Sequence, residues 1–170
     1  MPNHCYQQVF IEGPHCLVSR LWDGLTENGY DPYNGGRCKG PQFCQLIVPM
    51  PIEQWQAPKT NWRGHEVSGW YDWRVNNWGT KWDVCEVTIE GEFLPTHPDE
   101  DQWSALRSTT STSFDFSCWT AWGPPTPVWD KLHEIGVDVH ATYQDEGGMF
   151  EGEYAYGTDR SWEPELMEEA

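Results

Sequence analysis

The sequence predicts an α+β domain in which helices pack on one face of a mainly antiparallel sheet. Three observations lead to this fold class. Residues 84–93 and 113–120 alternate between apolar and polar side chains, as strands do when one face of a sheet is buried. Residues 137–156 have the pattern of a hairpin around Gly147-Gly148. The strands and helices also lack the regular alternation that builds a parallel sheet.

The first half of the chain is the less regular half, because stretches rich in Gly, Asn, Asp and Pro interrupt its apolar segments. Gly13-Pro14 closes the first strand, and Gly79 stops the last helix of this half. In order, we expect a strand at 7–12, a short helix around 17–22, a loop insertion at 23–41, a buried strand at Phe43–Val48, a second loop insertion at 52–66 and a helix at 69–78.

The second half contains clearer signals. In the strand at 84–93, Cys85, Val87 and Ile89 point inward, and the next strand turns Phe114 and Phe116 the same way. A helix follows, capped by Thr126 and stopped by Gly136, with its apolar face formed by Val128, Leu132 and Ile135.

The register of the hairpin follows from a two-residue turn at Gly147-Gly148, because a slip by one residue would mix its apolar and polar faces. We expect the paired core positions Tyr143–Gly152, Ala141–Tyr154 and Val139–Tyr156. Residues 1–157 then form a single domain, and residues 158–170 are expected to be a mobile acidic tail.

Charge is distributed very unevenly along the chain. There are 27 acidic and 10 basic residues, and the formal net charge is −17. Residues 1–82 contain 7 acids and 7 bases, whereas residues 83–170 contain 20 acids and 3 bases. A field of this sign repels nucleic acid and anionic membrane surfaces and attracts basic proteins. We therefore expect a basic protein partner, no direct contact with nucleic acid and no contact with a membrane.

The sequence also indicates a cellular location. No run of eighteen apolar residues is present, and the N-terminus lacks the basic and apolar segments of a secretory signal. We expect a cytoplasmic protein of a bacterial host cell, with its six cysteines as thiols.

The candidate partner-binding residues are carboxylates on the polar sides of the predicted strands. Alternation places them together on the sheet face that no helix covers. They are Glu86, Glu90, Glu92, Asp115, Asp138, Glu151 and Glu153.

Metal binding and catalysis have weaker signals. His4-Cys5 and His15-Cys16 repeat a dipeptide, but no closely spaced Cys pair is present, so we expect no metal and no cofactor. No nucleophile motif occurs, so no catalytic residue is assigned and no enzyme is expected. The tryptophans at 70–82 are expected to pack the helix on the sheet. An alternative remains open, in which tryptophans and His140 line the pocket of a small-ligand-binding protein or an enzyme.

Several sequence blocks resemble one known family. They are Trp70-Tyr71-Asp72-Trp73, Asn77-Trp78-Gly79-Thr80-Lys81-Trp82-Asp83, Phe116-Ser117-Cys118-Trp119-Thr120-Ala121-Trp122-Gly123-Pro124-Pro125 and Tyr143-Gln144-Asp145-Glu146-Gly147. Together with the opening Met1-Pro2-Asn3, they are similar to the YubB-type ferredoxin-like family of phages and plasmids. The resemblance implies a ferredoxin-like sheet with helices on one side and an origin in a mobile element. It implies no catalytic residues.

These observations favour a non-enzymatic interaction protein. Carboxylates spaced along a sheet can imitate the phosphates of DNA and compete for Arg and Lys. A natural target is a basic, nucleic-acid-binding host protein such as a defence nuclease, which the protein would inhibit. The competing explanation is that the acidity only keeps the protein soluble.

Overall fold

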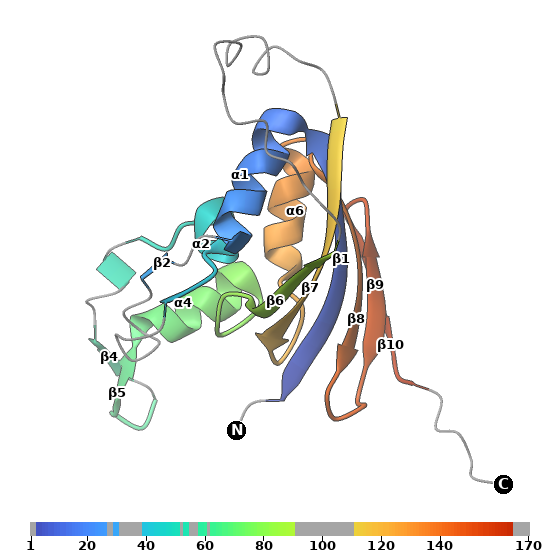
Figure 1. The fold of residues 1–170 in the computed structure, drawn as a ribbon. Helices are drawn as coiled ribbons and strands as arrows, with labels where there is room; N and C mark the ends of the chain where they lie inside the picture. Colours follow the sequence, from blue (N-terminus) through green and yellow to red (C-terminus); the bar gives the residue numbers. More distant parts are fainter. Residues whose placement is uncertain are drawn as a thin grey trace, which may run out of the picture.

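The computed structural model describes residues 3–26, 29–30, 39–51, 53–54, 58–60, 62–90 and 111–164. Its centre is a six-stranded antiparallel sheet with the strand order β10-β9-β8-β1-β7-β6 (Figure 1). The strands are β1 (His4–Pro14), β6 (Cys85–Glu90), β7 (Ser111–Ala121), β8 (Asp138–Asp145), β9 (Glu151–Ala155) and β10 (Thr158–Trp162).

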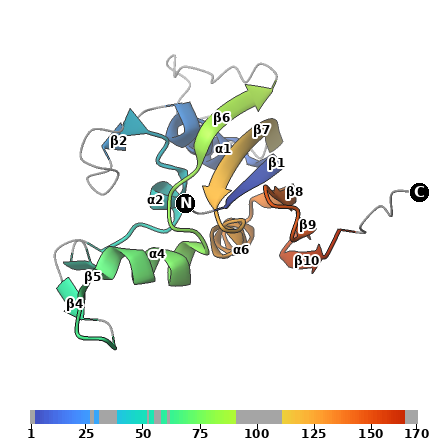
Figure 2. The same ribbon diagram turned by 90° about the horizontal axis from the view of Figure 1, so that it is seen from below.

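The helices lie on one side of this sheet, and the α+β class predicted from the sequence is confirmed (Figure 1). Seen from below, the sheet curves from β6 to β10 around α6 (Figure 2). None of the helices in the described residues has both the length and the apolar composition needed to cross a bilayer. They are α1 (His15–Thr26), α2 (Phe43–Ile47), α4 (Gly69–Trp78) and α6 (Thr126–Glu134).

The core fills the space between the sheet and the helices. Val9 and Ile11 of β1 are buried there, because β1 is the central strand between β7 and β8. The same core cluster includes Val18 of α1 and Trp129 and Leu132 of α6, each at most 1% exposed. Burial of such side chains stabilises the fold by roughly 1.5–3 kcal/mol each.

The apolar run at 43–48 forms helix α2 and not the predicted strand. Asp83 explains the difference: its buried carboxylate accepts hydrogen bonds from the main-chain N–H groups of Cys44 (2.8 Å) and Gln45 (2.9 Å) at the start of the helix. The N–H of Val84 donates a third bond, also of 2.8 Å. Burial raises the pKa of Asp83, and these bonds partly offset the rise. A short apolar run fits a strand and a buried helix equally well, so this capping by a distant residue decides the outcome.

The two regions predicted as loop insertions contain short paired strands. In the first, β2 (Gly29–Tyr30) pairs with β3 (Lys39–Gly40). In the second, β4 (Pro58–Thr60) pairs with β5 (Glu66–Ser68), which leads directly into α4. Helix α4 has the predicted bounds, Gly69–Trp78, and is followed by Gly79, whose φ of 76° suits a glycine.

The hairpin register is confirmed, since Tyr143 pairs with Gly152 and Ala141 with Tyr154. The turn is longer than predicted, because the main-chain N–H of Asp145 donates to the oxygen of Phe150, which leaves four residues in the loop. Tyr156 does not join the core and is 59% exposed.

Three further details of the predicted elements are wrong. Residues 158–162 form strand β10 along β9, so a mobile tail does not begin at residue 158. The residue at the cap position of α6 is Pro125 and not Thr126. Ile135 was predicted to belong to the apolar face of α6 but is 46% exposed, whereas Trp129 of the same helix is buried in the core. The helix ends just before Gly136, as predicted, and the φ of 92° at Gly136 suits a glycine.

Candidate functional site: the open face of the sheet

The described helices all lie on one face of the six-stranded sheet, and we call the other face, which these helices leave uncovered, the open face. Strict alternation in β1, β7 and β8 sends every second side chain to the core and the others to this surface. Its side chains include Tyr6, Gln8, Phe10 and Glu12 of β1, Glu90 of β6, Asp115, Ser117 and Trp119 of β7, Asp138, His140 and Thr142 of β8, Glu151 and Glu153 of β9, and Arg160 of β10.

Two pairs of carboxylates face each other across neighbouring strands. Glu90 of β6 lies opposite Asp115 of β7. Glu12 of β1 lies opposite Asp138 of β8. All four side chains are exposed. Like charges directly opposite in an antiparallel sheet destabilise it, so this arrangement costs free energy in the isolated protein.

Cations are scarce on the same strands. Within the described strands of the six-stranded sheet, the only Lys or Arg is Arg160, which lies opposite Glu153. The four carboxylates of the two pairs take part in none of the ion pairs found in the described part of the chain.

A shallow hollow of about 230 Å³ lies on the open face beside one of these pairs. Phe10 of β1 lies in the middle of the hollow, because it pairs with His140 of β8 on one side and with Asp115 of β7 on the other. The hollow therefore combines an aromatic ring with two carboxylates and small hydroxyl groups. Its lining includes Gln8, Phe10, Glu90, Asp115, Ser117, His140 and Thr142.

His140 is held at the edge of this hollow by Glu153. Its Nε2 lies 2.6 Å from the Glu153 carboxylate, and both side chains are about half exposed. None of the described tryptophans lines the hollow, so among the described residues the two features of the alternative function, a tryptophan pocket and His140, do not meet there.

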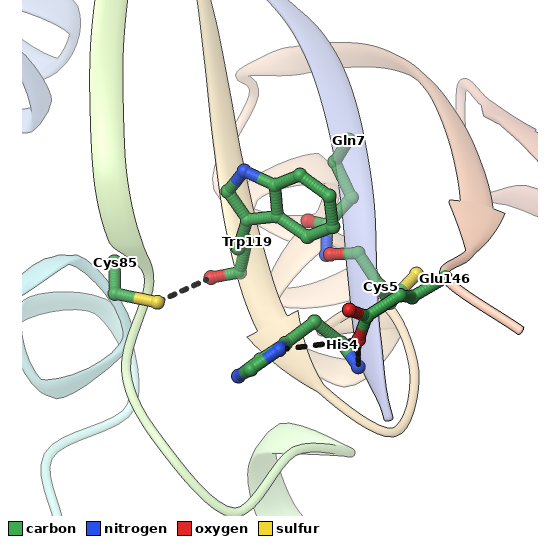
Figure 3. Close-up of polar contacts among 6 residues, drawn as sticks. All are labelled: His4, Cys5, Gln7, Cys85, Trp119 and Glu146. Atoms are coloured by element: carbon green, nitrogen blue, oxygen red, sulfur yellow. Dashed lines mark hydrogen bonds and ion pairs between the residues drawn. The ribbon is translucent and has the colours of Figure 1, made fainter. Parts of the chain in front are cut away.

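A group of rings continues the open face toward the start of β1. The ring centroids of Tyr6 and Trp119 are 5.1 Å apart, and those of His4 and Trp119 are 6.2 Å apart. Figure 3 shows His4 and Glu146 pointing toward each other, with the Trp119 indole nearby; the His4 Nδ1 lies 3.3 Å from the Glu146 carboxylate. These rings are not among the site residues predicted from the sequence, although alternation along 113–120 places Trp119 outward.

Most of the predicted partner-binding residues are where alternation placed them. Glu90, Asp115 and Asp138 are exposed, and Glu151 and Glu153 are half-buried. Glu86 is also exposed, but it sits in a β-bulge between Cys85 and Thr88 with a φ of 49°, so it leaves the regular alternation. Glu92 lies outside the described residues.

The tryptophans of the α4 region divide into two groups. Trp78 is fully buried, and Trp70 and Trp73 pack against the core, as expected from the sequence. Trp82 does not belong to this core; its ring lies 5.9 Å from His4.

Cysteine chemistry at the candidate site has no geometric support. Burial raises the pKa of Cys5 to about 12, and it also raises the pKa of Cys44 and of Cys118. Cys85 Sγ contacts the main-chain oxygen of Trp119 at 3.4 Å (Figure 3). In the part of the chain that the structure describes, no three His, Cys, Asp or Glu side chains are arranged to hold a metal ion.

Comparison with family models and with curated proteins finds no match. Among solved structures, the chain is similar to the crystal structure of the protein api92 from Yersinia pseudotuberculosis, of family model DUF1281. The TM-score is 0.53 and the sequence identity is 10%, and the likeness covers 98% of this chain and 99% of that one. At this identity the likeness shows the fold alone.

Proposed function

We propose that this protein acts without catalysis, by binding a basic surface of a partner protein through the open face of its sheet. The observation that carries the proposal is that two pairs of carboxylate residues lie opposite each other on neighbouring strands, Glu90–Asp115 and Glu12–Asp138. Each pair is unfavourable in the free protein and becomes favourable when a cation lies between its members.

The geometry of a sheet gives this surface a regular spacing. Neighbouring strands are roughly 4.8 Å apart, and successive outward side chains along one strand are about 7 Å apart. Carboxylates at such intervals offer several acceptors to one basic surface at a time. Positive grooves of nucleic-acid-binding proteins are built to hold rows of anionic phosphates, so they match this array in sign and in the need for many contacts.

The partner class we favour is therefore a basic host protein that binds nucleic acid, such as a bacterial defence nuclease. The protein would occupy its groove and exclude DNA from it. A phage or plasmid origin in a bacterial cytoplasm is part of this hypothesis, as is the relationship to the YubB-type family.

The proposal includes a more specific assignment of the fold within the α+β class. The elements β1-α1-β6-β7-α6-β8 follow the order of a β-α-β-β-α-β unit, and the neighbouring strands β8-β1-β7-β6 fit its split arrangement. We infer a ferredoxin-like core to which β9 and β10 add two strands at the β8 edge. In such a core one sheet face stays free of helices and is available for binding.

A capture experiment with matched variants tests the proposal. The immobilised protein is exposed to the DNA-binding fraction of a bacterial lysate at low salt, and bound proteins are then challenged with double-stranded DNA. The face variant is Glu90→Gln with Asp115→Asn. The control is Asp23→Asn with Glu134→Gln, which removes the same charge from exposed positions on helices α1 and α6.

We expect wild type and the control to retain DNA-binding proteins that DNA or 0.5 M salt releases. The face variant should retain much less, because partner charges at an interface chiefly control association. Equal retention by the face variant would contradict the proposal and leave solubility as the reason for the acidity.

A further inference from the structure

The hollow on the open face has a feature that the charge of the surface does not explain, namely the ring of Phe10. It lines the hollow in the same cross-strand row as Asp115 and Glu90. Phe10 does not belong to the core or to the hydrophobic side chains packed against it. It also takes part in none of the ring–ring or cation–ring contacts found in the described part of the chain.

A ring beside two carboxylates discriminates between the two basic side chains. The planar guanidinium of arginine can lie flat on a ring while its N–H groups form two parallel hydrogen bonds to a carboxylate. The ammonium group of lysine is compact and strongly hydrated, and it interacts with carboxylates as a point charge. The hollow therefore offers arginine two interactions at once.

Rings in this protein already lie closer to the guanidinium groups of Arg63 and Arg74 than to the ammonium group of Lys81. The Arg74 guanidinium carbon lies 4.7 Å from the centroid of Trp78 and 5.2 Å from that of Trp70. Arg63 lies 4.6 Å from the ring of Trp62. The Lys81 ammonium stays at 5.4–5.9 Å from its three rings, Tyr71, Trp82 and Trp122.

We infer that the hollow accepts an arginine side chain of the partner protein, and that Phe10 makes this site select arginine over lysine. The inference rests on the proposed function and narrows it, since the partner must present arginine on its basic surface. Charge complementarity identifies the occupant: two facing carboxylates line the hollow, and none of the described residues that line it is Lys or Arg.

Three synthetic peptides test the inference by titration calorimetry at low salt. They are four-repeat Gly-Arg, Gly-Lys and Gly-citrulline peptides with blocked ends, where citrulline is the neutral analogue of arginine. We expect the arginine peptide to bind wild type roughly two- to fivefold more tightly than the lysine peptide, the range expected for a cation on an exposed ring. The citrulline peptide should show no binding.

The variant Phe10→Leu keeps an apolar side chain and removes the ring. It should weaken arginine-peptide binding to the level of the lysine peptide and leave lysine-peptide binding unchanged. The control Trp62→Leu removes a ring that is 87% exposed on the β4–β5 hairpin, and it should preserve the preference. Thermal melts establish that each variant is folded. If Phe10→Leu does not fold, Phe10→Met takes its place, because it also removes the ring and keeps an apolar side chain, and the same loss of preference is expected.

The outcomes separate the two ideas. Equal binding of the arginine and lysine peptides to wild type, above the citrulline peptide, overturns the selectivity and leaves the proposed function standing. A preference that survives Phe10→Leu overturns the role of Phe10. Binding of neither charged peptide above citrulline overturns both the inference and the proposed function.

Discussion

Removing one charge from the Glu90–Asp115 pair should stabilise the protein. Opposed residues in an antiparallel pair have Cβ atoms about 5 Å apart, which places their carboxylates at roughly 6 Å. Two unit charges at that distance repel by about 0.7 kcal/mol in the dielectric of water. We therefore expect Glu90→Gln to raise the free energy of unfolding by about 0.5–1 kcal/mol at low salt, and Tm by roughly 1–4 °C.

Thermal and urea unfolding at 10 mM and 1 M NaCl provide the assay. The gain should nearly vanish at 1 M NaCl, where the Debye length is about 3 Å. A double-mutant cycle isolates the pair, because Asp115→Asn should add little once Glu90→Gln is present. The control Glu134→Gln breaks the 2.8 Å ion pair with Lys131 and should lower stability by about 0.3–0.5 kcal/mol.

The reasoning about the open face would be refuted by a gain that is the same at both salt concentrations, or by additive effects of the two substitutions. The first result would mean that charge repulsion is not what Glu90→Gln relieves. The second would mean that Glu90 and Asp115 do not interact.

Three further predictions concern the fold and its thiols. Gly152→Ala should destabilise the protein by about 3 kcal/mol in urea unfolding, because a Cβ there would lie 2.3 Å from the Tyr143 ring and 2.5 Å from a main-chain oxygen. A variant as stable as wild type would disprove the β8–β9–β10 packing. Tyr156→Asn should raise the free energy of unfolding by roughly 1 kcal/mol, since Tyr156 has a φ of 49° in the two-residue turn between β9 and β10 and asparagine tolerates this conformation. A lower Tm of the variant would contradict this prediction. Three thiols are buried, those of Cys5, Cys44 and Cys118, and burial raises the pKa of each and keeps it protonated. At pH 8 they should react with Ellman's reagent only after the protein unfolds. Rapid reaction of any of them in the native protein would show that this thiol is accessible.

The elements that could be predicted well are those whose pattern is local. Alternation along β7 identified Phe114 and Phe116 as core positions and Asp115 as an outward position. The hairpin register followed from the segregation of its two faces around Gly147-Gly148, since a slip by one residue moves every side chain to the other face.

The elements that could not be predicted depend on distant residues. The run at 43–48 becomes a helix because Asp83 accepts hydrogen bonds from its first turn. Strand β10 has little apolar signal of its own, and the exposed strand residues 158–162 are held by pairing with β9. Helix α2 and strand β10 both depend on hydrogen bonds to other segments of the chain, which the periodicity of the sequence cannot predict.

The candidate site also has features that the local sequence pattern predicts and features that it does not predict. The sequence by itself determined that Glu90, Asp115, Asp138 and Glu153 point away from the core, because the period of a strand is set by its backbone. Only the tertiary structure decided that β1 lies between β7 and β8, and hence that Glu12 meets Asp138 and Phe10 lies beside Asp115. Strand order depends on how separate segments pack around one core, so side chains far apart in the chain become neighbours only when the sheet forms.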